Sequence, residues 1–230
     1  MRRIDYVSAY RKALEENVSE VKKAVLTRDS AMLLKIHNYS ERFNLPEKFV
    51  EHKILKDNVF ANQFAKDPSK QSLHQKIAAD FISSITEVVN FAQLPASGGD
   101  ACYICDDGVV RKGVCSHGLT KSIDFYWEYG DCRYFAAHKH TTYEGGAQDN
   151  QFNDLQAFLE NASKSTLANT FFIAIGDGEY YQKKYTESGV SYETRIDYMN
   201  SNYGSEFALA ATCNDLEEFM VAHSGNRMIE

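Results

Sequence analysis

The sequence predicts an α/β protein whose mixed, largely antiparallel central sheet is flanked by helices and preceded by a helical N-terminal layer. Over roughly the first 93 residues, apolar side chains recur every three or four positions, the spacing of amphipathic helices. Beyond Pro95–Gly99, short β-rich runs alternate with turns. The 230 residues are 43% hydrophobic and 25% charged, as in folded globular proteins. We therefore expect a single domain over 1–230, with a helical layer over 1–93 and a sheet-containing core over 94–230.

Several helices are predicted along the N-terminal layer. Apolar residues form one stripe over 4–25, and Ser30 begins a second helix. Pro46 lies in the first turn of a third helix, where proline is favoured because its missing N–H would have no helical partner. A long helix follows Pro68-Ser69 and runs to about Val89.

The core begins with two predicted β-hairpins, whose turns are Asp106-Asp107-Gly108 and Gly130-Asp131. Their four strands are expected over residues 102–105, 109–114, 122–129 and 132–140. The remaining elements are a helix over 148–162, strands over 170–175 and 207–212, and a helix from Asn214 or Asp215.

The turn of the second hairpin fixes which residues face each other. A two-residue turn at Gly130-Asp131 pairs residues whose numbers sum to 261, so Asp124 lies opposite Ala137. Because side chains alternate between the two faces of a strand, Asp124, Ala137 and Lys139 are expected on one face. An Asp and a Lys are costly to bury unless they are paired or solvated in a cleft. The hairpin is therefore expected to carry a polar site.

The charge distribution narrows the classes of function. A net charge of −7 counts against the broad basic surface of a nonspecific nucleic-acid binder. Residues 1–70 carry a net +4 and residues 71–230 a net −11, so a cation-binding centre is expected in the second part. No apolar run approaches the roughly 18 residues of a membrane span, and the first residues lack a secretion signal, so we expect a cytoplasmic protein without membrane contact.

The second hairpin and the helix after it resemble a known enzyme core. Asp124, the turn, Ala137-His138-Lys139 and then Gly145–Asn150 at the start of a helix are similar to the core of type II restriction endonucleases of the PD-(D/E)xK nuclease superfamily. The motif of that family is Asp, a variable spacer, then Glu or Asp, any residue and Lys. Asp124 matches the first carboxylate and Lys139 the lysine, whereas Ala137 departs from the motif because alanine cannot bind a metal. The resemblance covers about residues 100–180.

The resemblance implies Mg²⁺-dependent, sequence-specific hydrolysis of double-stranded DNA at a short palindromic site by a homodimer. Asp124 and position 137 would bind Mg²⁺, which polarises the phosphate and lowers the pKa of the attacking water. Lys139 would orient or deprotonate that water and stabilise the developing charge. An acid from the preceding helix often joins such sites, and Asp80 is preferred here over Glu87.

The missing carboxylate at Ala137 has two explanations. Either Ala137 is an engineered replacement of Glu, or the acid has moved to the following helix, with Asp149 or Asp154 reaching back. The first explanation is preferred, because an otherwise complete motif with alanine at this position is what a Glu→Ala change would leave. With alanine at this position we expect the chain to be inactive or weakly active, whereas robust cleavage would show that the carboxylate lies elsewhere.

Other polar residues are candidates for DNA contacts, although helix capping and ordinary solvated surface explain each of them as well. These candidates are Gln148, Asp149, Asn150, Asn153, Arg111, Lys112 and Lys121.

The cysteines allow a second kind of metal site. Five cysteines in a chain of this length are expected to be free thiols or metal ligands. Cys102, Cys105, Cys115 and His117 have the composition of a structural zinc site, while in the competing interpretation the cysteines are small apolar residues of a hairpin. Two alternative functions follow: a structure-specific nuclease of repair or recombination from the same superfamily, and a non-enzymatic interaction protein stabilised by zinc.

Overall fold

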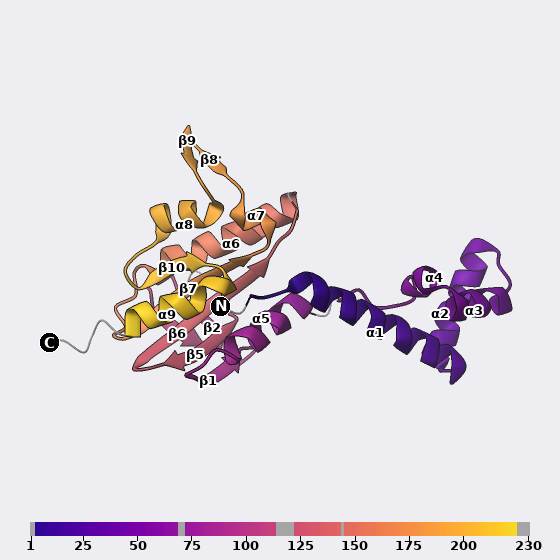
Figure 1. Ribbon diagram of the computed structural model, residues 1–230. Coiled ribbons are helices and arrows are strands. Elements are labelled where there is room, and N and C mark those ends of the chain that lie inside the picture. The colour runs from indigo at the N-terminus through magenta and orange to yellow at the C-terminus, as the bar shows by residue number, and fades with distance from the viewer. Residues whose placement is uncertain (1–2, 69–71, 114–121, 144, 225–230) are drawn as a thin grey trace. The chain divides into compact units, whose positions relative to one another are not determined.

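The computed structural model describes residues 3–68, 72–113, 122–143 and 145–224, with the side chains of 146–148 left out (Figure 1). The chain divides into two compact units. One unit comprises Asp5–His74, and the other begins at Gln75 and also takes in Ile4. The sequence predicts an internal boundary at Pro95–Gly99; the units separate earlier because the helix that contains Gln75 packs on the central sheet.

The first unit is built of helices joined by short turns. Its helices are α1 (Tyr6–Leu26), α2 (Ser30–Phe43), α3 (Glu47–Lys56) and α4 (Asn58–Asn62). Asp5, Asp29 and Asp57 cap α1, α2 and α4, because each carboxylate accepts a main-chain N–H of the first turn. Apolar residues of the four helices form one buried cluster that includes Ile36, with no exposed surface. The first three predicted helices are thus confirmed.

A mixed five-stranded sheet, in the order β1-β5-β6-β7-β10, forms the centre of the second unit. Its strands are β1 (Val88–Gln93), β5 (Phe125–Tyr129), β6 (Cys132–His140), β7 (Thr170–Asp177) and β10 (Ala208–Ala211). The pairs β1–β5 and β5–β6 are antiparallel, whereas β6–β7 and β7–β10 are parallel. The predicted mixed α/β class is therefore confirmed.

Helices cover both faces of this sheet (Figure 1). α6 (Gly146–Ala162), α7 (Glu179–Gln182) and α8 (Arg195–Tyr203) contribute to the apolar cluster on one face. α5 (Leu73–Ser83) and α9 (Leu216–Ser224), which follows the short 3-10 helix η2 (Cys213–Asp215), contribute to the cluster on the other. The two faces are called the α6 face and the α5 face below.

The second hairpin has the predicted register. Phe125 pairs with Ala136 and Trp127 with Tyr134, as the two-residue turn requires. All four side chains lie on the α5 face, where the Trp127 and Tyr134 rings stack with centroids 5.4 Å apart. Such a pair adds about 0.5–1.5 kcal/mol to the stabilisation from burial alone.

Two smaller sheets flank the centre. β2 (Cys102–Ile104) pairs antiparallel with β3 (Val110–Lys112) and with β4 (Ser122–Ile123), which confirms the first predicted hairpin. β8 (Tyr185–Glu187) and β9 (Val190–Tyr192) form a separate two-stranded ribbon. Within the described ranges, no helix is both long and apolar enough to cross a membrane.

The prediction of helix as far as Val89 is wrong at its end. α5 stops at Ser83, and Val88 begins β1, which pairs with β5. Glu87 has a φ of 70°, a left-handed value that breaks a helix. The β-branched Val88 and Val89 then favour the extended pairing.

Gly178 illustrates how closely the segments after β6 and β7 approach each other. It follows the last residue of β7 with a φ of 97°, and a Cβ there would lie 2.3 Å from the carbonyl oxygen of Thr141. Gly189 has a similar φ of 83° but only open space around it. A Cβ at Gly178 would therefore require the main chain to move, whereas one at Gly189 would not.

We expect Gly178→Ala to destabilise the protein more than Gly189→Ala. Both changes carry the left-handed penalty of about 1–2 kcal/mol, and only Gly178→Ala adds an overlap worth about 1–3 kcal/mol. Urea unfolding of the two variants measures the difference. Equal losses would show that the main chain is not closely packed at Gly178.

Candidate functional site

Asp124 is held at the end of the ladder between β5 and β6. Its side chain is 4% exposed, Oδ2 accepts the main-chain N–H of His138 at 2.8 Å, and Oδ1 accepts the amide Nε2 of Gln75 at 2.8 Å. Main-chain N–H groups of a strand point toward the neighbouring strand. The Asp124 carboxylate therefore occupies the place of a main-chain acceptor, and it links β6 to α5.

The position of this carboxylate differs from the alternation that the sequence predicts. β4 ends at Ile123 and β5 begins at Phe125, so Asp124 lies in a break between two strands. Ile123 packs on the α6 face, whereas strict alternation would place it with Phe125 on the α5 face. Because Asp124 lies in this break and not in a regular strand, its carboxylate leaves the face of Ala137 and reaches α5.

Ala137 and Lys139 share one face, the α6 face, so the predicted common face is confirmed for these two residues and wrong for Asp124. Ala137 is completely buried in the cluster that contains Leu155 and Ala174. Lys139 Nζ lies 3.0 Å from Asp154 Oδ2 of α6, with the lysine side chain 17% and the aspartate 45% exposed. Asp154 is thus the carboxylate of α6 that reaches back to Lys139.

Gln75 is the residue of α5 that the structure brings to Asp124. Asp80 is exposed, on a different side of α5 from the buried Ala78 and Ala79. Glu87 precedes Val88, which pairs with Tyr129 at the end of β5 far from Asp124. Sequence reasoning missed Gln75 because an amide side chain does not stand out among carboxylates as a candidate ligand.

A second polar group lies next to this ladder on the α5 face. His138 Nε2 lies 3.2 Å from Asp177 Oδ2, and Asp177 Oδ1 accepts the main-chain N–H of Cys213 at 2.9 Å. All three residues are buried. Within the described part of the chain, they form the group of His, Cys and acidic residues that could hold a metal ion, since their ligand atoms lie within 4.8 Å of one another.

The candidates for base contacts occupy the first turns of α6. Asn150 and Asn153 are exposed, and Gln148 lies in the first turn with its side chain outside the described atoms. Asp149 accepts the Tyr180 hydroxyl at 2.9 Å. Burial, together with this hydrogen bond, raises the pKa of Tyr180. Asp149 is thus engaged within the fold, while the two asparagines face solvent.

The basic candidates of the first hairpin are paired with acids. Arg111 donates two hydrogen bonds to the Asp107 carboxylate, at 2.7 and 2.5 Å, and this pairing lowers the pKa of Asp107 to about 2. Lys112 Nζ lies 3.1 Å from Asp100. A phosphate would have to compete with these carboxylates. Lys121 lies outside the described residues.

The predicted zinc group is only partly described. Cys102 begins β2 and is partly exposed, while Cys105 follows β2 and is buried. Burial raises the pKa of the Cys102 thiol. Cys115 and His117 lie outside the described residues, so this group stays a prediction.

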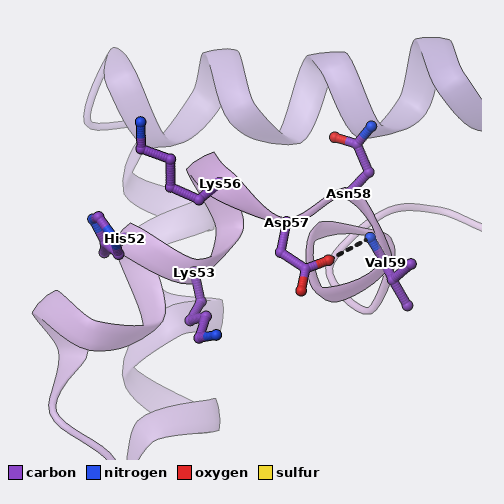
Figure 2. A pocket seen from close by; sticks show the side chains of 6 residues that line it. All are labelled: His52, Lys53, Lys56, Asp57, Asn58 and Val59. Carbon is purple, nitrogen blue, oxygen red and sulfur yellow. Dashed lines mark hydrogen bonds between the residues drawn. The ribbon is translucent and has the colours of Figure 1, made fainter.

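The helical unit carries a basic hollow of its own (Figure 2). Its volume is about 510 Å³, and it is lined by His52, Lys53, Lys56, Asp57, Asn58 and Val59. Asp57 is occupied in capping α4, because its Oδ1 accepts the N–H of Val59 at 2.9 Å. The two lysines are exposed and belong to the part of the chain with a net positive charge.

No protein-family model, curated protein or solved structure matches this chain. Its function is therefore inferred from the sequence motif and from the geometry of the two polar groups at the end of the sheet.

We expect Asp124→Asn to lower the free energy of unfolding by about 1–3 kcal/mol. Both Asp124 oxygens face N–H donors, whereas an asparagine offers one acceptor and turns its own NH₂ toward the other donor. Asp80→Asn on the exposed side of α5 is the matched control, and we expect it to change stability by less than about 0.5 kcal/mol. Urea unfolding compares the two, and equal stabilities would contradict the role of Asp124.

Proposed function

We propose that this chain is a Mg²⁺-dependent endonuclease of the PD-(D/E)xK type that acts on double-stranded DNA. The observation that carries the proposal is the position of Asp124 and Lys139 at the same end of the antiparallel pair β5–β6. α5 precedes this pair along the chain and α6 follows it, the order that the resemblance implies. Each helix also contributes a side chain, Gln75 to Asp124 and Asp154 to Lys139.

The residues present fit a Mg²⁺ ion that is held largely by its substrate. Mg²⁺ in proteins is commonly bound by one or two carboxylates together with waters and substrate phosphates. Asp124 offers a carboxylate at this end of the sheet, whereas Ala137 offers no ligand atom. When bound, the ion would polarise the phosphate and lower the pKa of a coordinated water.

Lys139 would supply positive charge to the attacked phosphate. Its ammonium is held by Asp154, and its side chain is mostly buried. A charge positioned in this way stabilises a developing negative charge without reorganising first. Asp154 therefore positions Lys139 and offers the second carboxylate that the motif lacks at residue 137.

The burial of Ala137 supports the second explanation for the missing acid. A carboxylate at this position would enter the apolar cluster beside Leu155 and Ala174 and would need a cation to offset its burial. Asp154 is half exposed and already reaches Lys139. We therefore place the migrated acid at Asp154, in place of the engineered replacement that the motif alone favours.

Sequence specificity and a homodimer are part of the same proposal. A palindromic site presents two equivalent bonds, which a two-fold symmetric dimer matches. Asn150 and Asn153, which are exposed on α6, can read base edges. Sequencing of random duplexes retained by the protein in Ca²⁺ tests this. Enrichment of one short DNA sequence supports the proposal. Retention of duplexes that share a structure and no sequence favours a repair nuclease. If no duplex is retained, the zinc-stabilised interaction protein is favoured.

We expect Lys139→Met to reduce the rate of Mg²⁺-dependent DNA cleavage by several orders of magnitude while leaving DNA binding nearly unchanged. Methionine keeps much of the side-chain volume and removes the charge. Lys164→Met is the matched control, because Lys164 is exposed beyond the end of α6, where its ammonium donates to the carbonyl of Asp106. Single-turnover cleavage and salt-titrated binding are measured on all three proteins. If Lys139→Met retained full activity, the Lys139–Asp154 pair would have a structural role and no role in cleavage.

We expect Ala137→Glu to destabilise the metal-free protein and Mg²⁺ to restore part of the loss. Ala174→Glu is the control, because Ala174 pairs with Ala137 across β6 and β7 and is equally buried. Both glutamates would face α6, but only residue 137 shares its strand and face with Lys139, which Asp154 contacts. We therefore expect only that variant to gain thermal stability from Mg²⁺. Melting curves with and without Mg²⁺ decide this, and an equal response of both variants argues against a metal position beside residue 137.

A further inference from the structure

Three different metal-binding side chains meet where the parallel strands end. His138 lies near the end of β6, Asp177 is the last residue of β7, and Cys213 follows β10 as the first residue of η2. Because β6, β7 and β10 are parallel neighbours, their carboxyl ends lie side by side. The exposed fractions of the three residues are 6, 2 and 0%. The sequence motif does not explain why these three side chains converge.

The distances in this group fit a tetrahedral metal ion. With Zn–N and Zn–O bonds of about 2.0–2.1 Å, two tetrahedral ligand atoms lie about 3.3 Å apart. His138 Nε2 and Asp177 Oδ2 are 3.2 Å apart, and the ligand atoms of all three residues lie within 4.8 Å of one another. Only small side-chain movements would therefore bring the three atoms to bonding distance of one ion.

The surroundings orient the carboxylate for this task. Asp177 Oδ1 accepts the main-chain N–H of Cys213, which turns Oδ2 toward the imidazole of His138. In metal sites, hydrogen bonds to the metal-binding side chains fix the direction in which those side chains point. The Phe125 ring packs beside the imidazole, with ring centroids 5.9 Å apart, and limits its rotation.

The chemistry of the ligands selects the metal. Mg²⁺ and Ca²⁺ take oxygen ligands, whereas a set of thiolate, imidazole and carboxylate suits Zn²⁺. A Cys, His and Asp together also resemble the residues of a nucleophilic enzyme. A completely buried thiol cannot meet a substrate without opening the fold, so a bound ion explains the group better.

We propose that His138, Asp177 and Cys213 bind one Zn²⁺ ion. The ion would join the ends of β6, β7 and β10 and so stabilise the main chain that positions Asp124, since the N–H of His138 donates to Asp124. This proposal does not rest on nuclease activity. This zinc site is also distinct from the group predicted around Cys102 and Cys105, because the two share no residue, and it would show one sulfur ligand where that group would show several.

The test uses the full chain, stripped of metal by a chelator and titrated with Co²⁺. A thiolate–Co²⁺ charge-transfer band that saturates at one equivalent and disappears on adding Zn²⁺ is the expected result. X-ray absorption of the Zn²⁺-loaded wild-type protein should show one sulfur at about 2.3 Å, with nitrogen and oxygen as the other ligands. This measurement needs no variant, so it is independent of how substitutions affect folding.

Three variants assign the sulfur. Cys213→Ser should abolish the charge-transfer band. Cys132→Ser should keep it, because Cys132 is a buried cysteine in the same apolar cluster but outside the group. Cys105→Ser should keep it as well. The proposal is overturned by a wild-type protein without the band, by two or more sulfurs around zinc, or by a band that Cys105→Ser removes and Cys213→Ser retains.

Discussion

A buried carboxylate must be surrounded by hydrogen-bond donors, and this constraint organises the end of the central sheet. Asp124 and Asp177 are 4% and 2% exposed. Each accepts a main-chain N–H from a different strand or turn, Asp124 from His138 and Asp177 from Cys213. Asp124 also accepts a hydrogen bond from the Gln75 side chain, and Asp177 faces the His138 imidazole. The two carboxylates therefore connect β6 to the elements on either side of it. Both acceptors therefore belong to the hydrogen bonding that holds β6 in place at this end of the sheet.

The two carboxylates share one residue, and this links the two candidate sites. The main-chain N–H of His138 holds Asp124, while its imidazole faces Asp177. A change at either carboxylate therefore acts on the strand that also carries Ala137 and Lys139. A substitution of either carboxylate is therefore expected to change both the stability of the protein and the position of Lys139. Farther along β5 and β6, Trp127 and Tyr134 pack in the apolar cluster of the α5 face.

Features determined by local sequence could be predicted, and features determined by distant pairing could not. The Gly130-Asp131 turn fixed the register of β5 and β6, because a two-residue turn leaves one pairing. β1 was predicted as helix because its partner β5 lies over thirty residues away and periodicity alone cannot reveal it. The break at Asp124 reverses an alternation that sequence reasoning has to assume.

The group of His138, Asp177 and Cys213 also combines features that local sequence predicts with one that depends on distant pairing. Each residue lies in or next to a predicted strand, but their meeting depends on the parallel order β6-β7-β10, which is set by long crossovers instead of turns. Gln75 was missed for a related reason, since its role follows from where α5 packs and not from its own chemistry.

Amide hydrogen exchange of the native protein tests most directly whether buried carboxylates serve as main-chain acceptors at this end of the sheet. The amides of His138 and Cys213 are the informative ones, since their described acceptors are the oxygens of Asp124 and Asp177. We expect both amides to exchange as slowly as those in the middle of β6, through global unfolding. Exchange as fast as that of exposed helix ends would contradict it.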